Sequence, residues 1–429
     1  MSPFMTRSFE FTFVVAGSLL LGSTSPTLAE EPLALTLSEA QALALRQSPE
    51  YLAARQDEPI ARGELRQARL PSSNPEVDVE APGVGSHGSL SEYQISISQE
   101  FEIGGQRGLR ARAAEHALQQ ARLNVEDTAR HLLADVTAAY YSAFAAARRS
   151  EVAAGSLALG ERLLEAVRNQ LSGGKVSDLE ANLTAIEAGR ARGRLLRARR
   201  EETAAQLELK HLIGLPTERA IRLVAPVPGT PDTPEARPAG LEVLMGTALA
   251  HRADLAARRA ALAEAQVRLD LARREAVPNL RAGPLVERTA DGGDSQVGAV
   301  VGLSLPLWNR NQGTVESLTA VLAQAQLDVR SAELTVQSEV ARAYRAFTAA
   351  DEEEAIFRTE VVNPTEENQR LLEIAYEAGK IDLPSLLLVR GQLLDAQLEY
   401  WEAWLAAREA LTELREATGE SSLAPTGLP

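Results

Sequence analysis

Acidic side chains gather around two Gly-Lys turns, QLSGGKVSDLE at 170–180 and YEAGKIDLPS at 376–385. Carboxylates that symmetry arranges into a ring attract cations into a pore. Carboxylates at an isolated helix end are ordinary solvated charge instead. Both interpretations stay open for the four acidic residues that flank the turns, which are Asp178, Glu180, Glu377 and Asp382.

The residue types that catalysis needs do not occur in catalytic spacing. Gly173-Gly174-Lys175 lacks the glycine spacing, the preceding strand and the following Ser or Thr of a phosphate-binding loop. There is no nucleophile elbow. Five histidines show no metal-ligand spacing, and they are His87, His116, His131, His211 and His251. We therefore predict no enzyme, no cofactor and no resident metal site.

Composition narrows the partners. The chain has 429 residues, with 59 Asp and Glu against 44 Lys and Arg, and a net charge of −15. This balance argues against nucleic acid as a partner, because phosphate binding needs a basic surface. Without cysteine, disulfides, thiolate metal sites and a lipid-anchored cysteine are excluded. With only three methionines, a relay of soft-metal ligands is disfavoured as well.

Residues 1–29 have the features of a secretory signal peptide. Arg7 supplies the positive charge, Phe11–Leu21 is an apolar core, and Thr27-Leu28-Ala29 is a small-residue cleavage site. No other apolar run reaches the roughly 18–20 residues that a spanning helix needs. We predict a mature chain that leaves the cytoplasm and is not a helical membrane protein.

The two turns lie 205 residues apart because the chain contains an internal repeat. VTAAYYSAFAAA at 136–147 matches VARAYRAFTAAD at 340–351, and SQEFEIGGQRG at 98–108 lies opposite LSLPLWNRNQG at 303–313. A Pro-rich stretch without helical period separates the halves. The predicted organisation is a first repeat at 30–215, a connector at 216–239, a second repeat at 240–419 and a flexible tail at 420–429.

Each half predicts a helix, two strands, a very long helix, a tip turn and a final helix. Apolar and polar residues alternate in YQISISQEFEI at 93–103 and in VGAVVGLSLPLW at 297–308. Shorter strand partners begin at Pro75 and Pro278, after loop signals. The prediction is a hairpin at about 75–103 and another at about 278–308, with tip turns at 171–178 and 377–384.

Heptad-like apolar stripes run along the long helices. One stripe consists of Leu318, Leu322, Ala325, Val329, Ala332 and Val336. Asn363-Pro364 predicts a break with Asn363 as the cap, and the acidic run at 351–354 predicts a solvated face. The last helix carries two stripes, which favours a neighbour on each side, as in helices rolled into a tube. An ordinary helix bundle stays open as the alternative.

The order and spacing of these features resemble the TolC family of outer-membrane efflux proteins, over essentially the whole mature chain. The motifs that carry the resemblance are SQEFEIGGQR at 98–107, Pro278-Asn279 at a strand start, the repeated segment at 136 and 340, and YEAGKIDLPSLL at 376–387. The resemblance implies a fold that is mainly α with a small β part. It implies a homotrimer, in which each protomer gives four strands to a 12-stranded β-barrel and its long helices to a coiled-coil periplasmic tunnel.

By matched position, the resemblance assigns the tip turns to the contact with a periplasmic adaptor and to the gate. These residues are Gly173, Gly174, Lys175, Val176, Ser177, Gly379, Lys380, Ile381 and Leu383. The glycines also fit a purely steric role, because glycine permits the left-handed backbone that ends a helix. Both interpretations stay open for them.

SQEFEIGGQR is similar to the corresponding strand in the cobalt–zinc–cadmium efflux branch, which favours divalent heavy-metal cations as the cargo. The resemblance implies a passive exit duct in outer-membrane lipid, with a large periplasmic extension. Its partners would be a periplasmic adaptor (membrane fusion) protein and an inner-membrane RND-type pump. Two alternatives stay open. One is the same channel serving multidrug efflux or type I protein secretion, and the other is a periplasmic coiled-coil adaptor or scaffold without a pore.

Overall fold

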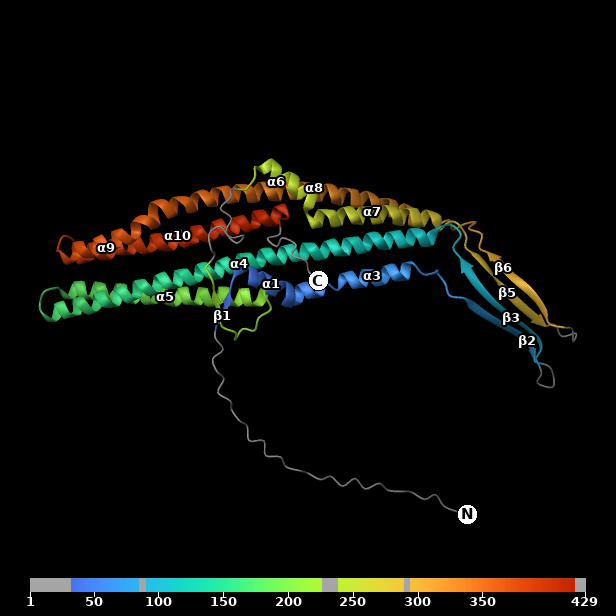
Figure 1. Cartoon of the computed structure of the whole chain (residues 1–429), viewed down its shortest axis with the longest axis horizontal. Coiled ribbons are helices and arrows are strands. Elements are labelled where there is room, and N and C mark those ends of the chain that lie inside the picture. The colour runs from blue at the N-terminus through green and yellow to red at the C-terminus, as the bar shows by residue number, and fades with distance from the viewer. Residues whose placement is uncertain (1–31, 85–89, 226–237, 289–293, 421–429) are drawn as a thin grey trace, which may run out of the picture.

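Figure 1 shows the structure, a computed structural model, as an elongated molecule with helices along its length. A β-sheet lies at one end and two helical turns lie at the other. The structure describes residues 32–84, 90–225, 238–288 and 294–420. The predicted signal peptide lies outside the described residues, as do half of the connector and nearly all of the tail. Among the described helices, none has the length and hydropathy required to cross a bilayer.

The two halves repeat one order of elements. The first half comprises α1 (Leu37–Gln47), α2 (Pro49–Ala54), α3 (Asp57–Ala68), β2 (Glu76–Val84), β3 (Leu90–Phe101), α4 (Gln106–Ser172) and α5 (Asp178–Leu212). The second half comprises α6 (Leu241–His251), α7 (Ala253–Arg274), β5 (Leu280–Arg288), β6 (Gln296–Leu303), α8 (Gln312–Ile356), the π-helix η1 (Phe357–Val362), α9 (Asn363–Glu377) and α10 (Leu383–Thr418). The predicted fold class, mainly α with a small β part, is confirmed.

Both long helices begin directly after a residue with left-handed backbone. Gly105 precedes α4 with a φ of 78°, and Asn311 precedes α8 with a φ of 61°. Glycine and asparagine are the residues that tolerate this conformation. The Asn311 side-chain amide donates to the carbonyl of Ala272 at 2.9 Å, and Gln106 donates to that of Val277 at 3.1 Å. These bonds fix the start of each long helix to the end of α7, where the chain enters the sheet.

The sheet joins the two halves in the order β2-β3-β5-β6, and every neighbouring pair is antiparallel. Its centre is the β3–β5 pair, in which Ile95 lies opposite Val286. The pairing is interrupted at Gly283-Pro284, because proline has no N–H to donate to the ladder. Gly283 lies so close to β3 that an added Cβ would overlap the carbonyl oxygen of Ile97.

Two short strands pair with each other beside the middle of α4, and we call this pair the clasp. The strands β1 (Leu33–Leu35) and β4 (Ile221–Leu223) pair in parallel. The hydroxyl of Tyr140, on α4, lies 3.0 Å from the carbonyl oxygen of Leu35 and 2.6 Å from that of Val224. Tyr140 is almost fully buried in the largest apolar core. The sequence pattern did not predict these strands, because three residues are too few to show alternation.

Helix α10 packs against both long helices, as its two apolar stripes predict. On one side, Trp404 contacts Tyr141 and Phe144 of α4 at ring-centroid distances of 5.7 and 5.5 Å. On the other side, Leu414 joins a core with Val336 of α8. The helix therefore connects the first half of the chain to the second.

Two predictions about the second long helix are wrong. Asn363 does not cap a new helix, because the chain passes from α8 through the π-helix η1 directly into α9, in which Asn363 is the first residue. A π-turn widens the helix and so relieves the clash that a proline imposes on the preceding turn. Glu354 is not on a solvated face. Its side chain is 5% exposed and lies 3.4 Å from Arg358 and 4.0 Å from Arg408 of α10.

Candidate functional site

Helices α4 and α9 end in the same hydrogen-bonded turn. At the end of α4, Gly174 has a φ of 69°, the Lys175 amide donates to the Gln170 carbonyl at 2.9 Å, and the Gly174 amide donates to the Leu171 carbonyl at 2.9 Å. At the end of α9, Gly379 has a φ of 67°, and the amides of Lys380 and Gly379 donate to the carbonyls of Ala375 and Tyr376 at 2.9 and 3.0 Å. This pair of bonds is the Schellman motif, which requires left-handed backbone at the glycine. The turns therefore require Gly174 and Gly379 for steric reasons, independently of any contact with a partner.

The helices that follow the turns begin with side-chain caps. Ser177 accepts a bond from the Glu180 amide at 3.3 Å, and the Ser177 amide donates to the Glu180 carboxylate at 2.7 Å. Asp382 accepts a bond from the Ser385 amide at 3.1 Å. The Ser177 amide holds the pKa of Glu180 below its usual range, and the bonds from Ser385 do the same for the pKa of Asp382. Two of the four predicted aperture carboxylates are thus helix caps that stay ionised at neutral pH.

The structure brings the two turns together at one end of the molecule (Figure 1). An apolar cluster lies between them, in which Val167 of α4 packs against Leu383 and Leu386 of α10. Val176 and Ile381, one from each turn, pack against the same cluster. These contacts hold the two helical hairpins side by side.

The predicted tip residues differ in what they expose. Lys175, Asp178 and Lys380 are exposed, whereas Leu383 is only 3% exposed. Leu383 therefore packs in the apolar cluster under the turn, and it contributes almost nothing to the exposed surface of the turn. Glu377 ends α9, and its side chain lies outside the described part of the structure.

A cavity of about 750 Å³ opens between the two hairpins beside the turns. Leu159 and Leu163 of α4, Leu372 and Tyr376 of α9, and Leu386 of α10 give it apolar walls. Burial raises the pKa of the Tyr376 hydroxyl, and the neighbouring Glu180 carboxylate adds to the rise. Tyr376 begins the turn sequence YEAGKIDLPS, but no local signal marks it as a site residue.

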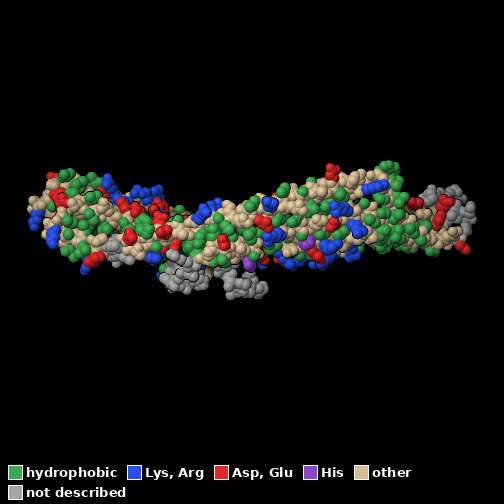
Figure 2. Space-filling model, turned by 90° about the horizontal axis from the view of Figure 1, so that it is seen from above, with side chains coloured by type: hydrophobic (Ala, Val, Ile, Leu, Met, Phe, Trp, Pro, Cys, Tyr) green, Lys and Arg blue, Asp and Glu red, His purple; other side chains and the backbone are tan. Residues whose placement is uncertain are grey.

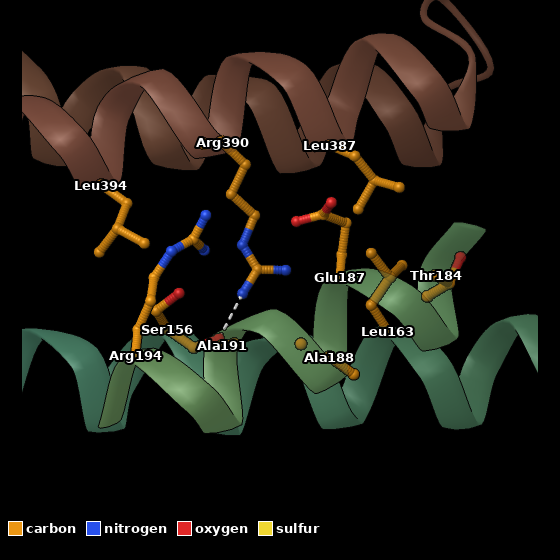
Figure 3. A pocket seen from close by; sticks show the side chains of 12 residues that line it. Ser156, Leu163, Thr184, Glu187, Ala188, Ala191, Arg194, Leu387, Arg390 and Leu394 are labelled. Atoms are coloured by element: carbon orange, nitrogen blue, oxygen red, sulfur yellow. Dashed lines mark hydrogen bonds between the residues drawn. The ribbon is translucent and has the colours of Figure 1, made fainter. Parts of the chain in front are cut away.

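A narrower cavity of about 40 Å³ continues along the same groove between α4, α5 and α10 (Figure 3). Arg390 points into it from α10 and donates to the Ser156 carbonyl of α4 at 2.9 Å. Arg194 and Glu187 of α5 line the same space. Burial lowers the pKa of the Arg390 guanidinium. No local sequence signal marks Arg390, since the α4 and α5 residues around it lie more than 190 positions earlier in the chain.

At the opposite end, the sheet exposes one apolar face. Green side chains gather over that end of the molecule in Figure 2. The exposed apolar side chains of the strands are Val77, Val79, Ile95, Ile97, Phe101, Val297, Val301 and Leu303. Asp78 and Ser96, which are opposite each other in the β2–β3 register, lie on the other face with Glu100 and Arg281. A contiguous exposed apolar surface of this kind marks contact with lipid or with another protein.

Comparison with known proteins decides the family. Residues 40–215 and 244–420 both match the family described as outer membrane efflux protein. The chain belongs to this family. The two matched segments cover most of the chain, one in each half, and they confirm the resemblance to TolC-type outer-membrane efflux channels.

Two curated proteins are similar to this efflux protein in sequence, and a solved structure is similar to it in fold. It is 25% identical to the cobalt-zinc-cadmium resistance protein CzcC of Cupriavidus metallidurans, over 85% of each chain. It is 29% identical to the nickel-cobalt-cadmium resistance protein NccC of Alcaligenes xylosoxydans xylosoxydans, over 94% of this chain and 90% of that one. Its fold matches the crystal structure of the Campylobacter jejuni CmeC outer membrane channel with a TM-score of 0.73 at 14% identity, over 89% of this chain and 85% of the other.

Proposed function

We propose that this efflux protein is a passive exit duct for divalent heavy-metal cations. The names of CzcC and NccC, which it resembles over most of its length, support a metal cargo. A periplasmic adaptor and an inner-membrane pump would deliver the cations, and the duct would hydrolyse nothing. The cations would cross in water, because a chain without cysteine offers few soft ligands.

The main support for this proposal is the distance between the sheet and the paired turns. Helix α4 has 67 residues, which corresponds to about 100 Å at 1.5 Å per residue. The sheet with its apolar face lies at one end of that length, and the paired turns lie at the other. This distance exceeds the thickness of a bilayer by about threefold. The geometry suits a protein that holds the outer membrane with its strands and extends its tips across the periplasm.

Closure of the sheet supports a homotrimer. The edge strands β2 and β6 leave backbone N–H and C=O groups unpaired, which lipid does not tolerate. Four strands are too few for a barrel, since membrane barrels start at about eight. Three copies that pair β6 of one protomer with β2 of the next would close a barrel of twelve strands.

Deletion of the gene in the native host tests the cargo. Growth is measured against zinc, cobalt, cadmium, nickel, copper and a panel of drugs, with the wild-type gene returned on a plasmid as the control. We expect sensitivity to divalent metals that the plasmid reverses. Sensitivity to drugs with metals tolerated would reject the metal cargo and keep the channel. A protein that washes off membranes with alkali would instead favour the scaffold without a pore.

A further inference from the structure

The apolar face of the sheet continues past the strands toward the helices. Ile103 follows β3, and Leu305, Leu307 and Trp308 follow β6, all of them exposed. Trp308 is 86% exposed, although it is a large aromatic residue. Exposed tryptophans are typical of the boundary between the hydrocarbon core and the headgroups of a bilayer. We define the helix-side border of the apolar face by these four residues.

Three exposed arginines lie directly beside this border. Arg107 is in the first turn of α4, Arg274 is the last residue of α7, and Arg310 stands two residues after Trp308. In Figure 2, blue patches adjoin the green end of the molecule. None of the three forms an ion pair with a carboxylate among the described residues, whereas their neighbours Arg110 and Arg273 pair with Glu102 and Asp270.

One of these arginines is already positioned by the backbone. Arg107 donates from Nε to the carbonyl oxygen of Arg69 at 2.6 Å. This bond fixes the direction of the side chain and leaves the outer nitrogen atoms of the guanidinium available. A guanidinium presents a planar fork of donors that matches the oxygen atoms of a phosphate group.

The chain carries a net charge of −15, and still no carboxylate pairs with these three guanidinium groups among the described residues. A basic group beside an apolar, aromatic border fits a ligand that has a negative head and an apolar body. Anionic phospholipid has both, and its surface attracts Lys and Arg side chains that lie near it. The apolar stem of each arginine can lie along the border while its head reaches the phosphate.

We propose that Arg107, Arg274 and Arg310 bind the phosphate groups of anionic phospholipids in the leaflet that faces the helices. This inference rests on the proposed location of the sheet in the outer membrane. The three residues would set the depth of the protein in the bilayer, because they bind at the level of the headgroups while Trp308 stays at the hydrocarbon boundary.

The test compares two triple variants of the full-length protein. R107Q/R274Q/R310Q removes the proposed contacts. R197Q/R199Q/R200Q removes the same charge from three exposed arginines of α5 that form no ion pair among the described residues. Each protein is reconstituted into vesicles of phosphatidylethanolamine with or without 30% phosphatidylglycerol, and flotation and circular dichroism confirm insertion and folding. Native mass spectrometry then measures the phosphatidylglycerol that stays bound.

We expect the wild type and the α5 variant to retain equal amounts of bound phosphatidylglycerol. The R107Q/R274Q/R310Q variant should retain at least fivefold less. Equal retention by all three proteins would overturn the proposal. Equal loss in both variants would also overturn it, because the effect would then come from net charge. Failure of the wild type to float with either kind of vesicle would reject the membrane location itself, which separates that failure from failure of the lipid contacts.

Discussion

The imidazole Nδ1 of His131, on α4, lies 2.6 Å from a carboxylate oxygen of Glu416, near the end of α10. Asp127 lies 3.5 Å from the other ring nitrogen. These two carboxylates raise the pKa of His131 to about 9, although the neighbouring Arg130 guanidinium opposes protonation. Arg130 also donates to the carbonyl oxygen of Glu416 at 2.8 Å. The first half of the chain thus holds the last turn of the final helix.

Replacement of His131 by Gln should make stability less dependent on pH. A raised histidine pKa stabilises the fold fully below the unfolded value of 6.5, and this stabilisation is lost as the pH rises through about 9. We expect the variant to be less stable than the wild type at pH 6, by about 1 kcal/mol because the ring is half exposed, and equal to it at pH 10. Thermal melts from pH 6 to pH 10 measure the difference. His116→Gln, on the same helix, is the control, and its melting temperature should change with pH as that of the wild type does. A difference between His131→Gln and the wild type that stays constant from pH 6 to pH 10 would contradict the role of protonation.

Replacement of Gly379 by Ala should destabilise the tip turn. Its φ of 67° forces a Cβ into a left-handed conformation that costs about 1–2 kcal/mol. Gly189→Ala is the matched control, since it lies within α5 with open space around an added Cβ. That change should stabilise by about 0.5–1 kcal/mol. Melting temperatures that shift in the same direction for both variants would contradict the steric account of the turn.

Replacement of Gly283 by Ala should disrupt the centre of the sheet. The new Cβ would overlap the carbonyl oxygen of Ile97, so β3 and β5 would have to separate. Gly298→Ala on β6 is the control, because the nearest atom to its Cβ is Leu285 Cδ2 at 3.7 Å, an ordinary contact. We expect a marked loss of folded protein in the membrane fraction for Gly283→Ala alone. Equal amounts of both variants would show that the sheet accommodates the methyl group.

Replacement of Glu354 by Gln should cost about 1–3 kcal/mol of stability, because it leaves the Arg408 cation without its buried counter-charge. Arg408 Nε has no hydrogen-bond partner in the described structure, and its guanidinium lies 4.0 Å from the Glu354 carboxylate and over the Trp404 ring. Glu353→Gln changes the exposed neighbour and should alter stability by less than about 0.5 kcal/mol. Chemical unfolding of the two variants measures the difference, and equal midpoints would show that the buried carboxylate is dispensable.

Asp178 and Asp382 allow a test of the cation ring that does not depend on helix capping. Asparagine caps a helix as well as aspartate does, so Asp382→Asn removes charge and keeps the cap. Asp178 accepts no cap bond and is exposed, so Asp178→Asn should leave stability unchanged. We expect both variants to lower the preference of the channel for cations in bilayer recordings. If both variants kept the selectivity and conductance of the wild type, the ring hypothesis would be rejected. The carboxylates would then be ordinary solvated charges.

Local signals in the sequence were sufficient for the strands of the two hairpins and for the turns. Alternation through residues 93–103 depends on neighbours two positions apart, and the Gly-Lys turns depend on one glycine each. Glu354 shows where local signals fail. An acidic run on a helix looks solvated, but the fold packs α10 over Glu354 and brings Arg408, 54 residues later, within 4.0 Å of its carboxylate. Arg390 and Tyr376 could not be predicted as cavity residues for the same reason, because the residues around them come from both halves of the chain.

The clasp of β1 and β4 has a consequence for the order in which the protein assembles. Leu33 pairs with Ile221, 188 residues later, and a chain is synthesised from its N-terminus. The earliest strand must therefore wait, unpaired, until all of α4 and α5 has emerged. Contacts between such distant residues form late, because the intervening loop must close first. The hydroxyl of Tyr140 therefore gains both of its carbonyl partners, Leu35 and Val224, only when the first repeat is complete.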